Sequence, residues 1–180
     1  MDCLNKFNFQ TDQFWGLIEA PVQLIQYGDF LCEHCGDVYP VIKLLQEKMG
    51  NNLLFIFRHY PVYTMHHLSL EAAMAAEAAA LQGKFWYMHD MIFENQKHLV
   101  RSSFAGFAEA INLDIKMFED SRGHKQLFHK VMKDRDNGVR YGVNATPTFF
   151  INGQRHTGFD DFDSLYNHCK HACSRLRVAV

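Results

Sequence analysis

Residues 27–40, with the sequence YGDFLCEHCGDVYP, constrain the fold of this chain more than any other stretch. The apolar run at 22–27 that leads into them is short and partly β-branched, which is typical of a buried strand. The segment that follows has apolar residues at helical spacing and ends at Gly50, a natural helix stop. Cys32 and Cys35 fall between the two. The predicted order is strand, loop, C-x-x-C and helix, which puts the first thiol at a helix N-terminus.

A thiol in this position is suited to nucleophilic chemistry. Cysteine attacks as the thiolate, and the free N–H groups of a helix start lower its pKa from about 8.5 into the range of ~3.5–7.5. Cys32 has this position, whereas Cys35, one turn further on, is expected to be buried and to attack a mixed disulfide formed at Cys32. His34 can add positive charge between the sulfurs. Glu33 adds an anion, and we expect it to raise the pKa of Cys32.

The rest of the chain alternates between strand and helix patterns. A second buried strand at 53–57 follows a helix over 32–49, so these elements form a βαβ unit with parallel strands. Residues 1–20 carry only a weak pattern. The next region is rich in helix formers, with helices expected at 69–82, 85–95, 102–111, 114–119 and 123–141.

Strand signals return near the C-terminal end. Residues 148–151 form an apolar strand, and Asn152-Gly153 is a strong hairpin signal. The antiparallel partner is expected at 154–157 and a closing helix at 162–175.

Composition excludes several classes of function. The 180 residues are 48% hydrophobic and 21% charged with a net charge of −2, which is typical of a globular α/β protein and does not indicate a nucleic-acid surface. No apolar run reaches 18 residues, so we expect no membrane span. The first residues lack a basic and apolar leader. A full-length chain would therefore be cytoplasmic, and one whose signal peptide had been removed would be periplasmic or otherwise exported.

The order of these motifs resembles the DsbA-like branch of the thioredoxin superfamily. The matching stretches are YGDFLCEHCG, FRHYP, AAEAAALQGKFWYMHD and GVNATPTFFING, and they span most of the chain. The resemblance implies a thioredoxin fold with an inserted helical domain. Residues 1–61 and 142–180 would form the thioredoxin-like domain, and 62–141 the insertion.

The resemblance also implies an activity and a site. Family members are thiol–disulfide oxidoreductases that exchange disulfides with protein substrates and are recycled by a redox partner. Cys32 would be the nucleophile and Cys35 the resolving thiol. Pro147 would be cis beside them, and the backbone of Thr146 would bind an extended substrate segment. The Cys32–Cys35 disulfide would be the redox group, with no metal or organic cofactor.

This chain departs from the family pattern at two positions. Well-known members have proline where Glu33 stands, so a strongly oxidising pair is not implied. Family sequences often carry an acidic residue at the position of Gln26, beneath the second cysteine, where it relays a proton. Glutamine cannot titrate, so we expect Cys35 to lose its proton through water or another group.

Three further cysteines leave other functions open. Cys169 and Cys173 share one face of the last predicted helix, and with Cys32 and Cys35 they could make a four-sulfur zinc site. A zinc-stabilised interaction module is therefore one alternative, but a peripheral disulfide or a chance pair is favoured over it, because Cys32 and Cys35 already have a better role. Cys3 is expected to be unpaired. A glutathione-dependent transferase or isomerase of related fold is a second alternative, but such enzymes typically lack the second motif cysteine.

Overall fold

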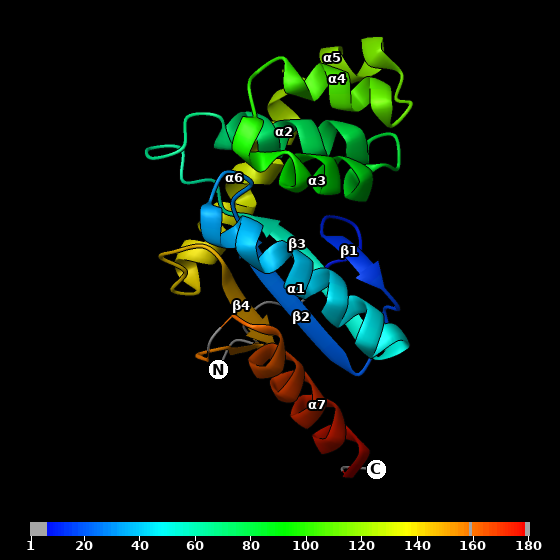
Figure 1. The fold of residues 1–180 in the computed structure, drawn as a ribbon, viewed down its shortest axis with the longest axis vertical. Helices are drawn as coiled ribbons and strands as arrows, with labels where there is room; N and C mark the ends of the chain where they lie inside the picture. Colours follow the sequence, from blue (N-terminus) through cyan, green and yellow to red (C-terminus); the bar gives the residue numbers. More distant parts are fainter. Residues whose placement is uncertain (1–6, 159, 179–180) are drawn as a thin grey trace.

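A computed structural model describes residues 7–158 and 160–178 and shows a five-stranded mixed sheet (Figure 1). The strand order is β1-β3-β2-β4-β5. β2 and β3 run parallel, and each of the other neighbouring pairs is antiparallel. The strands are β1 (Gln13–Gly16), β2 (Val22–Gly28), β3 (Leu53–His59), β4 (Thr148–Ile151) and β5 (Gln154–Arg155).

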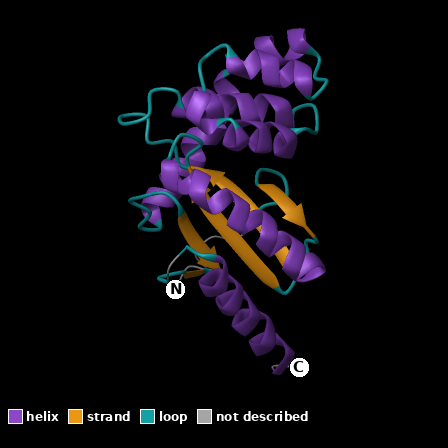
Figure 2. Cartoon of the chain, in the orientation of Figure 1, coloured by secondary structure: helices purple, strands orange, loops and turns teal. Residues whose placement is uncertain are grey.

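Helices cover the sheet and extend beyond one end of it (Figure 2). In Figure 1, α1 crosses the sheet, α2 to α5 gather at one end of the molecule, and α7 lies at the other. The α-helices are α1 (Glu33–Met49), α2 (Ser69–Ala80), α3 (Phe85–Glu94), α4 (Ser103–Ala110), α5 (Ile115–Arg122), α6 (Lys125–Arg140) and α7 (Phe162–Val178), with short 3₁₀ helices η1 (Gly50–Asn52) and η2 (Gln96–His98). No helix within the described ranges is long and apolar enough to cross a bilayer.

The α/β architecture predicted from the sequence is confirmed. β2, α1 and β3 form the expected unit with parallel strands, and the five predicted helices between β3 and β4 all occur within about three residues of their expected ends. Helices α2 to α6 are thus inserted in the sequence between β3 and β4, the two strands that flank β2 in one sheet. The domain boundaries at 61 and 142 stay a prediction. The order of the elements is compatible with them.

Strand β1 was not predicted. It pairs antiparallel with β3, with Gln13 opposite Phe57 and Gly16 opposite Leu54. The strand has only four residues at a sheet edge, and its burial does not alternate, so period-two patterning could not reveal it. At Gly16, φ is +103° and a Cβ would lie 2.1 Å from the carbonyl oxygen of Leu53. This turn therefore requires glycine.

The two faces of the sheet contribute to two apolar clusters. Leu24, Phe55 and Phe57 belong to the larger one together with the buried face of α1, whereas Ile25 and Ile56 belong to the smaller one on the other side. This alternation follows from the period-two geometry of strands. It places the side chain at position 26 on the face beneath α1.

Charged side chains connect the sheet to the helical block. Glu77 of α2 is central, because one carboxylate oxygen lies 2.9 Å from His59 Nε2 and the other accepts from Gln13 Nε2 at 2.9 Å. Lys130 of α6 lies 3.5 Å from Glu77 and also pairs with Asp134. Each of these side chains has a hydrogen-bonded or ion-paired partner within the group, as buried polar groups need to avoid a desolvation penalty. They fix how the helical block sits on β1 and β3.

Candidate active site

Cys32 lies at the N-cap of α1, as the sequence predicts. Its backbone is extended, its N–H donates to Asp29 O at 3.2 Å, and its carbonyl accepts from Gly36 N at 3.1 Å. The first N–H groups of α1, which have no partner within the helix, therefore lie next to Cys32 and favour a negative charge on its sulfur. The residue as a whole is 8% exposed.

Asp29, three residues before Cys32, holds the loop in place. The carboxylate is buried and accepts hydrogen bonds from Leu31 N at 2.9 Å, Val62 N at 3.0 Å and His66 Nδ1 at 2.8 Å. It also accepts one from the Ser69 hydroxyl. A single residue thus joins the loop before α1 to the segment that enters α2. Nothing in the local sequence identifies this role, because three of the four donors lie more than 30 residues away.

The structure brings the Thr146–Pro147 segment to Cys32. The Cys32 thiol donates to Thr146 O at 3.2 Å, although the two residues are 114 positions apart. The Thr146–Pro147 peptide bond is cis. This segment leads directly into β4, which pairs with β2. The pairing of β2 with β4 therefore positions the two parts of the site.

The surroundings of Cys32 stabilise its thiolate. A hydrogen bond from the Cys35 thiol has the largest effect, and together with the Thr146 side chain and the backbone N–H groups of Cys35 and His34 it outweighs burial. These interactions lower the pKa of Cys32 from 9.0 to about 5. Cys35 is fully buried, and burial together with its contact to Cys32 raises its pKa well above the usual value. At neutral pH, Cys32 is therefore the more readily ionised thiol of the pair.

This difference predicts how alkylation of Cys32 depends on pH. Because only the thiolate reacts, the rate should be constant from pH 8 to 6, fall to about half at pH 5, and drop about tenfold per unit below that. The measurement is the iodoacetamide reaction rate of reduced protein, with mass spectrometry to assign the modified residue. A rate still rising steeply between pH 7 and 9 would contradict a stabilised thiolate.

The two residues between the cysteines both face solvent. Glu33 is exposed in the first turn of α1, and the exposed ring of His34 lies 3.9 Å from Asp37 rather than between the sulfurs. The backbone N–H of His34 contributes to the lowered pKa of Cys32. An effect of the His34 side-chain charge on Cys32 stays a prediction. The effect of Glu33 stays a prediction: Glu33→Pro should lower the pKa of Cys32, and an equal or higher value would contradict it.

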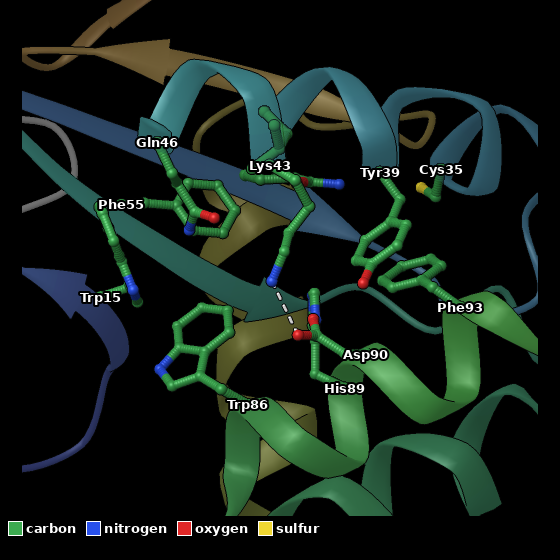
Figure 3. A pocket seen from close by; sticks show the side chains of 12 residues that line it. Trp15, Cys35, Tyr39, Lys43, Gln46, Phe55, Trp86, His89, Asp90 and Phe93 are labelled. Atoms are coloured by element: carbon green, nitrogen blue, oxygen red, sulfur yellow. Dashed lines mark hydrogen bonds and ion pairs between the residues drawn. The ribbon is translucent and has the colours of Figure 1, made fainter. Parts of the chain in front are cut away.

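Gln26 and Cys35 line the same small cavity beneath α1. Figure 3 shows the cavity with Cys35 among its labelled side chains. Gln26 is 3% exposed and lies on β2, level with Phe57 on one side and Phe149 on the other. The structure therefore agrees with the expected position of Gln26 below the second cysteine. The cavity is considered further below.

Gln96, from the helical block, is a site residue that sequence reasoning missed. Its amide Nε2 donates to Phe30 O at 2.9 Å and to Cys32 O at 2.8 Å. A Cβ at position 36 would lie 2.2 Å from Gln96 Oε1, so Gly36 makes room for this contact. The glycine after C-x-x-C is the one local signal of a close approach; its partner, 60 residues away, carries none.

Replacing Gln96 by alanine should loosen the loop before α1. Two hydrogen bonds to backbone carbonyls are lost, and at a net value of about 0.5–1.5 kcal/mol each the free energy of unfolding should fall by about 1–3 kcal/mol. Urea denaturation measures this, with the exposed neighbour Lys97→Ala as the matched control. Equal stability of the two variants would show that the Gln96 contacts do not hold the loop.

The remaining cysteines do not gather into a metal site. Cys169 is buried on α7 and Cys173 is partly exposed on the same helix; both are free thiols. Among residues 7–158 and 160–178, no group of three or more histidine, cysteine or acidic side chains is arranged to hold a metal ion. The four sulfurs of the zinc alternative are thus not brought together. Cys3 lies outside the described residues.

Comparison with known proteins identifies the family. A family model described as thioredoxin matches residues 8–169. The fold is similar to Wolbachia pipientis alpha-DsbA1, with a TM-score of 0.85, 22% identity and 96% of each chain covered. It is also similar to BdbD from Bacillus subtilis, with a TM-score of 0.83, 20% identity, and 93% of this chain and 95% of that one covered. The chain belongs to the thioredoxin family, and its fold is the thioredoxin fold with the inserted helices of DsbA-like structures.

Curated relatives of this chain are named as antiporters rather than as thioredoxin-like proteins. The chain is 39% identical over 158 residues to a Na(+)/H(+) antiporter NhaA 1 of Mycolicibacterium gilvum, which covers 87% of this chain and 26% of that protein. A protein of the same name from Mycolicibacterium vanbaalenii is 40% identical over 156 residues. The match covers 86% of this chain and 25% of that protein. The chain spans about a quarter of the length of these relatives. The antiporter activity in their names is therefore a property of much longer proteins.

Proposed function

We propose that this chain is a thiol–disulfide oxidoreductase that exchanges disulfides with protein substrates through Cys32 and Cys35. The observation that carries the proposal is the meeting of a low-pKa thiol at a helix start with the Thr146–Pro147 segment, 3.2 Å from Cys32 Sγ to Thr146 O. A structural cysteine pair requires neither a stabilised thiolate nor an accessible sulfur.

The first step is an attack by the Cys32 thiolate on a substrate disulfide. A bond forms between Cys32 Sγ and one substrate sulfur, and the other substrate sulfur leaves as a thiolate. The free N–H groups of α1 and the Cys35 thiol stabilise the negative charge on Cys32 before attack. The low pKa keeps this sulfur ionised at neutral pH.

In the second step, Cys35 attacks Cys32 Sγ, forms the Cys32–Cys35 disulfide and releases the reduced substrate. The hydrogen bond from the Cys35 thiol that lowers the pKa of Cys32 supports this step, because it requires the two thiols to lie close together. The same steps run in reverse when the pair oxidises a substrate dithiol. No metal or organic cofactor enters the chemistry.

The backbone around Thr146 is the proposed substrate-binding strand. Thr146 and Pro147 are partly exposed and immediately precede β4. An extended substrate segment could pair with this backbone as an added strand, which would hold its sulfur in line with Cys32. A redox partner that restores the starting state of the pair completes the cycle.

Reduction of insulin by dithiothreitol tests the proposal. The protein should accelerate precipitation of the insulin B chain, and Cys32→Ser should lower the rate to that of dithiothreitol alone. Cys173→Ser, which replaces a thiol far from the motif in sequence, is the matched control and should retain the activity. Unaltered activity of Cys32→Ser would dismiss the proposal.

A further inference from the structure

The cavity beneath α1 holds two amide side chains without protein partners. Its volume is about 30 Å³, enough for about two waters. Gln26 and Gln46 line it, are 3% and 6% exposed, and make no side-chain hydrogen bond within the part of the chain that the structure describes. A buried amide without a protein partner needs water. Ordered water in this cavity would satisfy both amides and contact the wall formed by Cys35.

A histidine–carboxylate pair forms another part of the cavity wall (Figure 3). His89 Nδ1 lies 3.0 Å from Asp90 Oδ1, and Lys43 Nζ donates to Asp90 Oδ2 at 2.8 Å. Because a carboxylate can only accept, Nδ1 carries the proton and Nε2 is the basic nitrogen. The lysine fixes the carboxylate, and the carboxylate fixes the tautomer of the histidine.

We propose that His89 is the proton acceptor for Cys35, which it reaches through water in this cavity. The inference rests on the proposed function and assigns the group that replaces a titratable residue at position 26. His89 is a positioning residue in this account, since it acts on the thiol through water and the Gln26 amide.

The proton balance of the resolving step requires such a group. The Cys35 S–H bond breaks, the Cys35–Cys32 bond forms, and the substrate sulfur leaves with the electron pair of the old disulfide. The proton passes through water to His89 Nε2 and later to solvent. In the opposite direction, a substrate thiolate displaces Cys35, and protonated His89 returns the proton to it.

The surroundings of His89 keep its ring neutral at pH 7. Burial is the largest effect and lowers its pKa, although the bond to Asp90 opposes this; Lys43 of α1 and His59 of β3 act in the same direction as burial. Tyr39 of α1 faces the ring at 6.0 Å between centroids. The remaining neighbours are the aromatic rings of Phe30, Phe57, Phe85, Trp86 and Phe93. A neutral imidazole near an apolar wall is an available base.

The test separates attack by Cys32 from release by Cys35. Reduced protein, with Cys3 and Cys173 replaced by serine, is mixed with a dithiobis-nitrobenzoate disulfide in a stopped-flow instrument. The first equivalent of nitrothiophenolate reports attack by Cys32, and the second reports displacement by Cys35. His89→Gln retains a donor to Asp90 but cannot titrate. It should slow the second phase at least about tenfold and remove its acidic inflection, with the first phase unchanged.

Two further variants complete the test. Tyr87→Phe, on the exposed face of the same helix, should behave as the parent protein. In the His89→Gln background, Gln26→Glu should restore the second phase, because it places a carboxylate in the same cavity. A parent-like second phase in His89→Gln, or equal slowing of both phases, would overturn the proposal.

If His89→Gln does not fold, Asp90→Asn provides the same test. Slowing of the second phase alone supports the relay, and an unchanged second phase overturns it.

Failure of the relay and failure of the proposed function give different results. If Cys32→Ser abolishes insulin reduction while His89→Gln releases substrate normally, the oxidoreductase stands and only the relay fails. If Cys32→Ser remains active, the oxidoreductase itself fails.

Discussion

Cys35→Ser should trap this protein on its substrate. Cys32 keeps its position at the start of α1 and attacks, but the mixed disulfide has no internal thiol to resolve it. Because a well-oriented internal nucleophile is worth an effective concentration of 10⁵ M or more, turnover that relies on millimolar external thiol should be at least about a thousandfold slower. Non-reducing electrophoresis of the variant after incubation with a disulfide-containing protein should show a stable adduct.

Mass spectrometry of this adduct locates the linkage. The account requires the substrate to be attached at Cys32, and the double variant Cys32→Ser/Cys35→Ser should form none. The serine hydroxyl can still donate a hydrogen bond to Cys32 in place of the Cys35 thiol, so the Cys32 thiolate should stay stabilised and attack should be retained. A Cys35→Ser protein that turns over at the parent rate would contradict the assigned roles.

Asp12→Ala should destabilise the fold more than any exposed substitution. Asp12 accepts from Arg58 Nε and Nη2 at 2.8 Å each, and the two side chains are 4% and 6% exposed. Asp12→Ala breaks a buried ion pair by removing one of its members, which typically costs about 3–5 kcal/mol. The free energy of unfolding from urea titration should fall by that amount.

A surface ion pair provides the control for this prediction. Lys116 and Asp120 pair at 2.7 Å, but their side chains are 87% and 62% exposed. Solvent screens such a pair, so Asp120→Ala should leave the free energy of unfolding unchanged within error. Similar losses in the two variants would show that the Asp12–Arg58 pair does not tie the start of β1 to β3.

Much of the fold follows from local patterns along the chain. The buried strands β2 and β3 are short and mostly apolar, and the helices between β3 and β4 have strong formers and clear ends. Their types could therefore be predicted with small errors in length. β1 could not, because an edge strand of four residues owes its form to pairing with β3 rather than to its own pattern. Pairing of this kind is a tertiary effect.

The residues of the candidate site also differ in whether the sequence alone can identify them. Cys32 and Cys35 are identified by their spacing at a strand–helix junction, and the resemblance adds Thr146 and Pro147. Gln96 carries no local signal, because its function depends on a contact between distant parts of the chain. Similarly, the sequence shows that Gln26 cannot titrate, but only the folded chain brings His89 to the same cavity.

The central claim is that Cys32 and Cys35 form a redox pair whose reduced state is stabilised by the Cys32 thiolate. A thiolate with a pKa of about 5 lies between those of thioredoxin, at about 7, and DsbA, at about 3.5. Equilibration with glutathione redox buffers, followed by alkylation and mass spectrometry, measures the potential directly. The account predicts one two-electron transition between Cys32–Cys35 dithiol and disulfide, with a midpoint between about −270 and −120 mV. A pair that stays reduced at every glutathione ratio, or a disulfide that forms between other cysteines, would contradict it.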